Sequence, residues 1–201
     1  MGGDPAAPRR VAAFDFDGTL TRRDSLAPFL ARTVGWPRLA LAAARDAAAV
    51  LAVASGRGDR DAAKERLLVR LLAGMSRDRL ERLGTEYGAM LARRRIRPAM
   101  RERVAWHRAA GHELVIVSAS LDVYLREVGR RLGFDAVLCS TLEFDEHGRC
   151  TGRLLGGNCR AQAKAERLRA YLGGAAAELW AYGDSAGDDA MLALADHPVR
   201  V

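Results

Sequence analysis

Residues 10–21 read RVAAFDFDGTLT, an apolar run that ends in two aspartates followed by glycine and threonine. The run over 11–16 predicts a buried strand, because nearly continuous apolar residues are typical of a parallel sheet covered on both faces. Alternation along a strand would place Asp15 and Asp17 on one side, with the residue between them turned into the core. Gly18 permits a sharp turn after the strand. The stretch therefore predicts two carboxylates at the carboxyl end of a buried strand.

Strands and helices alternate over the second half of the chain. Further strands are predicted at 113–117, 136–139, 179–182 and 199–201, with a hairpin over 142–155 that turns at 147–148. Helices are predicted between them, at 98–110, 121–132, 161–172 and 188–195. Such alternation indicates the α/β fold class, here a Rossmann-like, doubly wound and mostly parallel sheet with helices on both faces.

The segment between the first two strands contains only helical patterns. Helices are predicted at 24–33, 37–55, 59–73 and 76–95, with Pro37 in a first turn and Gly74 at a helix end. The predicted domains are therefore an α/β catalytic core of residues 11–21 and 98–201 and an all-α cap of residues 22–97. Residues 1–10 are expected to form a disordered, solvated tail.

The chain is basic, and the excess charge lies in the predicted cap. The whole sequence carries a net charge of +7, whereas residues 22–97 contain 17 Lys and Arg against 8 Asp and Glu, a local excess of +9. Aromatic residues are not interleaved with these charges, and no nucleic-acid module is recognisable, so no specific nucleic-acid partner is expected. A solvated basic surface is the favoured interpretation. A basic module that binds nucleic acid or an acidic membrane surface stays as the alternative from another class.

Neither a membrane span nor a disulfide framework is expected. The apolar stretch 36–54 has Arg45 and Asp46 in its middle, which favours a packed helix over stable membrane insertion. The three cysteines are an odd number without C-x-x-C spacing, so disulfides and zinc sites are not expected and a cytoplasmic location is predicted. The oligomeric state is left open.

Polar residues follow three of the predicted strands. Asp15 and Asp17 follow the first, Ser118 follows ELVIV, and Asp184 follows LWAY, with Asp188 one turn later. Ligands of open α/β sheets bind outside the carboxyl ends of the strands, so these side chains are expected to converge. Converging carboxylates repel one another and call for a cation, and an all-oxygen ligand set suits Mg²⁺.

The two opening aspartates can be given separate chemical roles. A carboxylate held beside a metal, here Asp15, can attack phosphorus and form an acyl phosphate. Asp17 could then protonate the leaving oxygen and later deprotonate the water that hydrolyses this intermediate. The competing interpretation is a strand-end turn whose carboxylates are simply solvated.

Four segments in this order, RVAAFDFDGTLT, VIVSAS, NCRAQAKAERL and YGDSAGDDAML, resemble the motifs of the haloacid dehalogenase superfamily of phosphohydrolases. A helical cap directly after the first motif resembles the phosphoserine phosphatase-like branch. The resemblance spans residues 9–201. It implies a Mg²⁺-dependent phosphomonoester hydrolase that forms an aspartyl-phosphate intermediate.

The resemblance also implies roles for individual residues. Asp15 would be the nucleophile and Asp17 the general acid/base. The Ser118 hydroxyl and the Ala119 N–H would bind phosphoryl oxygens, and Lys164 would neutralise phosphate charge and orient the nucleophile. Thr19 and Gly187 are further candidates for phosphate or substrate contact.

The metal site follows from the same resemblance. Mg²⁺ would be held by Asp15, by the carbonyl of Asp17 and by Asp184. Asp188 would hold metal-bound water or Lys164.

The substrate is less closely defined than the reaction. Asp24 stands where phosphoserine phosphatases carry a glutamate that binds the substrate amino group, and Ala119 and Gly187 replace a glycine and an asparagine of that branch. A cap base for a substrate carboxylate could be Lys64, Arg66 or Arg70. The expected substrate is thus a small, amine-bearing phosphorylated metabolite: phosphoserine, histidinol phosphate or another.

Several alternatives stay open from the sequence. Ser118 could cap the next helix, and Arg160 or Arg167 could replace Lys164 as the base on its helix. A phosphotransferase would use the same residues with an alcohol in place of water. The four histidines fall outside these motifs and are interpreted as structural or surface residues: His107, His112, His147 and His197.

Overall fold

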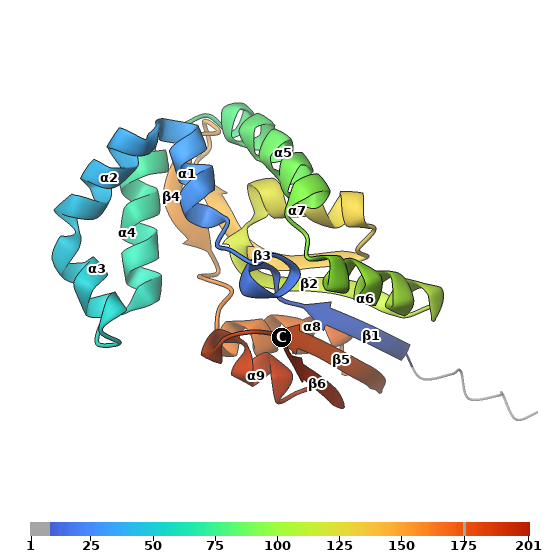
Figure 1. The fold of residues 1–201 in the computed structure, drawn as a ribbon. Helices are drawn as coiled ribbons and strands as arrows, with labels where there is room; N and C mark the ends of the chain where they lie inside the picture. Colours follow the sequence, from blue (N-terminus) through green and yellow to red (C-terminus); the bar gives the residue numbers. More distant parts are fainter. Residues whose placement is uncertain (1–8, 175) are drawn as a thin grey trace, which may run out of the picture.

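The computed structural model describes residues 9–174 and 176–201, and a six-stranded sheet forms its centre (Figure 1). The strand order is β4-β3-β2-β1-β5-β6, and every pair is parallel except the antiparallel β3–β4 hairpin. The strands are β1 Arg9–Phe14, β2 Glu113–Leu121, β3 Ala136–Phe144, β4 Cys150–Leu155, β5 Ala177–Gly183 and β6 His197–Arg200. The predicted α/β class with a mostly parallel sheet is confirmed.

Helices cover both faces of this sheet, as a doubly wound fold requires. Figure 1 shows α6 (Pro98–Ala109) and α7 (Asp122–Leu132) on one face, and α8 (Gln162–Leu172) and α9 (Asp189–Leu192) on the other. Alternate residues of β1 enter the two cores: Phe14 packs in the cluster that includes α6 and α7, and Ala13 in the cluster that includes α8 and α9. Both faces are therefore buried, which explains the unbroken apolar run of the sequence.

Five of the helices between β1 and β2 precede α6 and form an insertion: α1 Leu26–Val34, α2 Trp36–Arg45, α3 Ala47–Ala54, α4 Arg60–Leu72 and α5 Arg77–Arg94. Among them, α5 packs most closely on the sheet's own helices. A Cβ added at Gly84 of α5 would lie 2.1 Å from the carbonyl oxygen of Val123 in α7. The glycine thus permits a backbone contact that any side chain would block. The residue range predicted for a separate cap domain stays a prediction.

The insertion also covers one edge of the sheet. Residues 74–77, between α4 and α5, exchange backbone hydrogen bonds of 2.8 Å with the hairpin: Gly74 N–H to the Cys150 carbonyl, Cys150 N–H to Met75, and Arg77 N–H to Gly148. These residues thus pair with the turn of the hairpin and with the first residue of β4, the outermost strand on that side of the sheet.

Some element boundaries differ from the sequence predictions. The helix predicted at 37–55 is two helices, because the chain breaks at Asp46, whose carboxylate pairs with Arg70 of α4 at 3.2 Å. The helix predicted at 188–195 is a short 3₁₀ turn followed by α9, which ends at Leu192. Periodicity could not reveal the break at Asp46, whose ionic partner lies on another helix.

The first strand begins earlier than predicted. Residues 1–8 of the expected tail lie outside the described residues, but Arg9 and Arg10 belong to β1. Arg9 forms an ion pair with Glu113 of β2 at 2.6 Å, and Arg10 one with Glu178 of β5 at 3.2 Å. Such pairs let a charged dipeptide extend a central strand. Among the described helices, none is both long and apolar enough to cross a membrane.

Candidate active site

Asp15 lies just beyond the end of β1, between the two neighbouring strands. Its N–H donates to the carbonyl of Tyr182 in β5 at 2.9 Å. The chain then makes a single wide turn over Phe16–Leu20, in which Gly18 has φ +89°. A Cβ on Gly18 would lie 2.2 Å from Oδ2 of Asp184, so glycine is required both by the backbone conformation and by the approach of that carboxylate.

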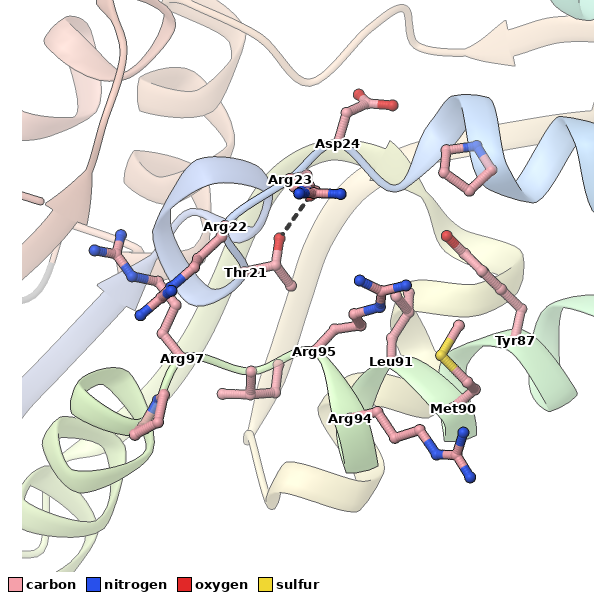
Figure 2. A pocket seen from close by; sticks show the side chains of 13 residues that line it. Thr21, Arg22, Arg23, Asp24, Tyr87, Met90, Leu91, Arg94, Arg95 and Arg97 are labelled. Carbon is pink, nitrogen blue, oxygen red and sulfur yellow. Dashed lines mark hydrogen bonds between the residues drawn. The ribbon is translucent and has the colours of Figure 1, made fainter.

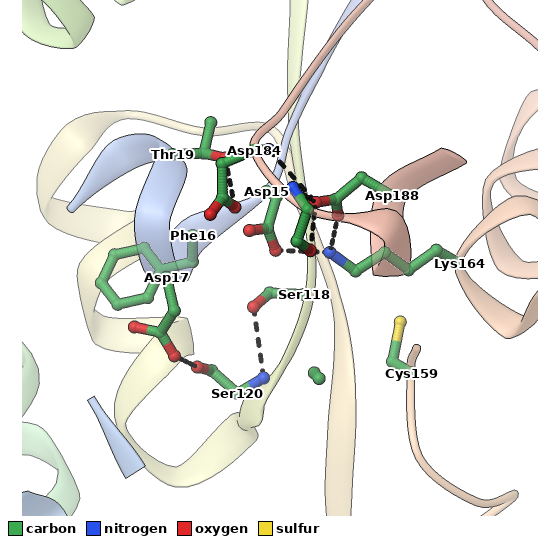
Figure 3. Close-up of polar contacts among 12 residues, drawn as sticks. Asp15, Phe16, Asp17, Thr19, Ser118, Ser120, Cys159, Lys164, Asp184 and Asp188 are labelled. Carbon is green, nitrogen blue, oxygen red and sulfur yellow. Dashed lines mark hydrogen bonds and ion pairs between the residues drawn. The ribbon is translucent and has the colours of Figure 1, made fainter. Parts of the chain in front are cut away.

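Lys164 joins two carboxylates in the interior. Its Nζ lies 2.5 Å from Oδ1 of Asp15 and 2.5 Å from Oδ1 of Asp188 (Figure 3). All three side chains are buried, with residue exposures of 4%, 5% and 0% for Lys164, Asp15 and Asp188. Two carboxylates around one ammonium leave the buried group with a net negative charge. The structure thus brings Lys164 to Asp15, whereas Arg167 of the same helix binds the carbonyls of Cys139, Gly156 and Gly157.

Burial and charge act in opposite directions on these groups. Burial and the charge of Asp188 raise the pKa of Asp15 to about 6, against the lowering effect of Lys164. Burial would lower the pKa of Lys164, but the two carboxylates outweigh it and raise that pKa. For Asp188 the burial effect is overcome by Lys164 and by hydrogen bonds from Ser185, so its pKa is lowered. Lys164 is therefore a stable cation.

A third carboxylate completes an acidic cluster. Asp184 follows β5 and accepts a hydrogen bond from Thr19 Oγ1 at 3.3 Å. One carboxylate oxygen from each of Asp15, Asp184 and Asp188 lies within 4.8 Å of the other two. Three negative groups against one lysine call for a further cation, and their oxygens are the ligands that Mg²⁺ prefers. This donor set fits the metal that the sequence predicts.

Asp188 is positioned differently from the other two acids. While Oδ1 binds Lys164, Oδ2 accepts hydrogen bonds from the Ser185 N–H at 3.0 Å and from the Ser185 hydroxyl at 2.9 Å. Both of its oxygens are therefore engaged by the protein. This arrangement favours the supporting role over direct metal binding.

Asp17 points to a separate group of hydroxyls. Its Oδ2 accepts hydrogen bonds from Ser120 at 2.7 Å and from Ser25 at 2.9 Å, while Oδ1 is buried without a hydrogen-bond partner among the described residues. Burial raises the pKa of Asp17 to about 7, with a further rise from the charge of Asp24 and an opposing effect of the two serines. A carboxyl with this pKa can both give and take a proton near neutral pH.

The alternation argument for these two aspartates does not hold in the structure. The strand ends at Phe14, so Asp17 lies in the following turn with φ −76° and ψ 121°. Phe16 is buried, as predicted. The serines that bind Asp17 were not singled out from the sequence. Ser120 stands two residues after Ser118 in VIVSAS, which is the signal that could have identified it.

Ser118 and Ala119 lie within a strand that is longer than predicted. Because β2 continues to Leu121, the helix α7 begins at Asp122 and Ser118 does not cap it. The Ser118 hydroxyl is buried and accepts a hydrogen bond from the Ser120 N–H at 3.2 Å. In the view of Figure 3 it faces the Asp15–Lys164 pair.

Of the three candidate cap bases, only Lys64 contacts the strand ends. Its Nζ donates to the Ala119 carbonyl at 2.5 Å and to Asn158 Oδ1 at 2.7 Å. Burial lowers the pKa of Lys64 to about 8, against nearby acids. Arg66 is exposed, and Arg70 is paired with Asp46. Asn158, which sequence reasoning missed, also donates to Asp61 at 2.7 Å.

Two predicted substrate contacts have structural roles. The Asp24 carboxylate is exposed and accepts a hydrogen bond from the Ala27 N–H at 3.0 Å, at the start of α1. The Gly187 carbonyl accepts one from the Ala161 N–H at 3.0 Å, at the start of α8.

The chain matches the family described as haloacid dehalogenase-like hydrolase over residues 12–193. Protein CicA of Caulobacter vibrioides is 36% identical over 197 residues, which cover 98% of this chain and 86% of CicA. A histidinol-phosphatase of Neisseria meningitidis serogroup C (strain 8013) is 29% identical over 136 residues, 65% of this chain and 61% of that protein.

Solved structures show the same fold. A protein of unknown function from Bordetella pertussis Tohama I has a TM-score of 0.82 and 28% identity, covering 96% of this chain and 90% of that one. A phosphoserine phosphatase with bound substrate has a TM-score of 0.66 and 20% identity, covering 94% of this chain and 84% of the other. The predicted likeness to the phosphoserine phosphatase fold is confirmed.

Proposed function

Because the chain belongs to the haloacid dehalogenase-like hydrolase family, we propose that it is a Mg²⁺-dependent phosphatase of small phosphorylated metabolites. The observation that carries this proposal is Lys164, held between Asp15 and Asp188 beside Asp184. A buried carboxylate next to a fixed ammonium can accept a phosphoryl group whose charge that ammonium offsets.

The proposed first step is transfer of phosphorus to Asp15. A carboxylate oxygen of Asp15 attacks phosphorus and forms an acyl phosphate, while the bond from phosphorus to the ester oxygen breaks. Asp17 gives its proton to that oxygen, so the product leaves as an alcohol. A pKa of about 7 means that a substantial fraction of Asp17 carries this proton at neutral pH.

The second step reverses these proton movements. Asp17, now ionised, takes a proton from a water molecule as the water oxygen attacks phosphorus. The bond between phosphorus and Asp15 breaks, and inorganic phosphate and free Asp15 are formed. An alcohol acceptor in place of water would make the protein a phosphotransferase, which product analysis with added alcohol would detect.

Phosphate binding is assigned to three groups: the Ser118 hydroxyl, the Ala119 N–H and Lys164. In the proposal Mg²⁺ is held by Asp15, Asp184 and the Asp17 carbonyl, and when bound it offsets phosphoryl charge as a Lewis acid. Thr19 fixes the orientation of Asp184 through its hydroxyl.

The proposed substrates are small and bear an amine. Support comes from the Neisseria histidinol-phosphatase and the phosphoserine phosphatase that the chain resembles, and from the acid Asp24 at the first turn of the inserted helices. Lys64 would contact an anionic group of the substrate. A cytoplasmic location belongs to the same proposal, and the three free, buried thiols are compatible with it.

The test is phosphate release from phosphoserine, histidinol phosphate, nucleotides, sugar phosphates and p-nitrophenyl phosphate, with and without Mg²⁺. Asp15→Asn should abolish turnover without changing the circular dichroism spectrum. Asp78→Asn, an exposed site on α5, is the matched control and should keep full activity. Activity retained by Asp15→Asn would refute the proposed nucleophile.

A further inference from the structure

A second concave site lies where the chain enters and leaves the inserted helices. The two linkers pair through a bridge between Thr21 and Ile96, and the Arg97 N–H donates to the Leu20 carbonyl at 2.9 Å. Together with the last turns of α5 they enclose a cavity of about 480 Å³, here called the hinge cavity (Figure 2). The acidic cluster, Ser118 and Lys164 do not line it, whereas Asp24, proposed above to contact the substrate amine, does.

Positive charge dominates this cavity. Its lining includes five arginines and a single acid, Asp24; the arginines are Arg22, Arg23, Arg94, Arg95 and Arg97. Figure 2 shows the Asp24 carboxylate directed away from the arginines. The guanidinium of Arg97 donates to the Gly18 carbonyl at 3.0 Å, whereas those of the other four bond to no described residue. Like charges gathered in this way repel one another unless an anion or solvent screens them.

The remaining lining is mostly apolar, with Pro28, Met90, Leu91, Ile96 and Pro98, and includes the hydroxyl side chains of Thr21 and Tyr87. A cavity of this size falls within the range of small-molecule sites, roughly 300–1,000 Å³. Guanidinium groups bind phosphate oxygens in a bidentate geometry that suits two or more adjacent phosphates. We infer that the hinge cavity binds an organic polyphosphate of the nucleoside diphosphate class. The arginines hold its phosphates, and the apolar residues lie against its ring.

The position of the cavity gives such a ligand a mechanical effect. Arg22 and Arg23 stand on the linker that enters the inserted helices, and Arg95 and Arg97 on the linker that leaves them. A ligand that bridges both linkers reduces the freedom of the helices they carry.

The test uses calorimetric titration of the Asp15→Asn protein in EDTA, so that nothing is hydrolysed. The probes are ADP, inorganic pyrophosphate, orthophosphate, adenosine and a short single-stranded RNA. We expect ADP to bind more tightly than pyrophosphate, and both more tightly than orthophosphate or adenosine. Raising the salt from 50 to 500 mM should weaken ADP binding on the order of tenfold or more.

Variants locate the binding site. Arg22→Glu combined with Arg95→Glu should weaken ADP binding at least about tenfold, because two attractive charges become repulsive. The matched control combines Arg79→Glu with Arg82→Glu on the exposed face of α5, and should bind ADP as the parent does. Ser118→Ala should also leave ADP binding unchanged. Arg95→Gln alone should raise the melting temperature at low salt, which provides a second readout if the double variant fails to fold.

Three results would overturn the inference. The first is no ADP binding at 1 mM. The second is binding that falls in Ser118→Ala but not in the Arg22/Arg95 variant, which would place ADP in the candidate active site. The third is binding of RNA without binding of ADP, which would make the arginines a macromolecular contact.

Discussion

The ammonium group of Lys64 lies 2.5 Å from the carbonyl oxygen of Ala119, although 55 residues separate them in the chain. The contact joins α4 of the insertion to the strand that carries Ser118. It places a cation whose pKa is lowered to about 8 at the edge of the candidate active site. A cation at that point can take part in substrate binding only while it keeps its proton.

Replacing Lys64 with methionine should therefore raise KM for anionic substrates by about tenfold or more, with a smaller effect on kcat, because a charge-assisted hydrogen bond is lost. In the parent protein kcat/KM should fall above about pH 8, as Lys64 loses its proton. Steady-state kinetics from pH 6 to 9.5 measure both effects. Arg66→Met, on the exposed side of the same helix, is the control; an equal loss there would point to general damage to α4.

Ser120→Ala should shift the pH dependence of activity. The Ser120 hydroxyl stabilises the ionised form of Asp17 through a 2.7 Å hydrogen bond, so its removal raises the Asp17 pKa above about 7. The part of the kcat–pH curve that follows the ionisation of Asp17 should move to higher pH. Ser55→Ala, at an exposed helix end, should leave the profile in place. An unchanged curve in Ser120→Ala would exclude Asp17 as the titrating group.

Folding stability should fall in mild acid because of His107. This side chain is fully buried; its Nδ1 lies 2.8 Å from His112 Nδ1, and its Nε2 lies 2.8 Å from the Tyr182 hydroxyl. Burial, with the neighbouring His112, lowers the pKa of His107 to about 4, whereas an unfolded histidine titrates near 6.5. Between about pH 4 and 6.5, His107 therefore binds a proton in the unfolded chain but not in the folded protein. The contribution of His107 to the free energy of unfolding is therefore fully present above about pH 6.5, and it is lost as the pH falls toward 4.

The measurement is urea unfolding at pH 8, 6 and 4.5 for the parent and for His107→Gln. The gap in unfolding free energy between them should shrink by up to about 3 kcal/mol on acidification. Comparing the two proteins removes the contributions of the other titrating groups. The exposed His147→Gln should follow the parent at every pH. A constant gap for His107→Gln would contradict the linkage.

Gly84→Ala should destabilise the packing of α5 on α7. The new Cβ would lie 2.1 Å from the Val123 carbonyl, a backbone atom that cannot rotate away. Forcing the helices apart should cost about 1–3 kcal/mol, measured by urea unfolding. Thr85→Ala, the exposed neighbour, should change stability by less than about 0.5 kcal/mol. Equal values for the two variants would show that the helices can separate freely.

The sequence predicted the sheet, its helical interruption and the meeting of Asp15 with Lys164, residues 149 positions apart. Those predictions rest on local signals, since strand ends of a parallel sheet meet at one edge whatever the rest of the fold does. The choice among three cap bases could not be made in this way. Lys64 contacts the site because of the way α4 packs on the β3–β4 hairpin. The periodicity of apolar residues in a helix does not predict that packing.

The same reason explains the missed residues. Asn158 and Ser120 act on Lys64 and Asp17 across tertiary contacts, and short polar side chains of this kind occur throughout loops and strand ends. The break at Asp46 depends likewise on a partner, Arg70, from another helix. Sequence patterns therefore could not predict which side chains of the insertion contact which residues of the sheet.

The pairing of residues 74–77 with the hairpin limits how a substrate can reach Asp15. A rigid outward swing of all five inserted helices would break three backbone hydrogen bonds to residues 148–150. A displacement of α2 and α3 alone breaks none of them. The loop after α3 faces Arg160 and Gly187 across a cavity that also contains Gly58 and Asp59. A substrate that enters at this tip would therefore leave the edge pairing of residues 74–77 intact.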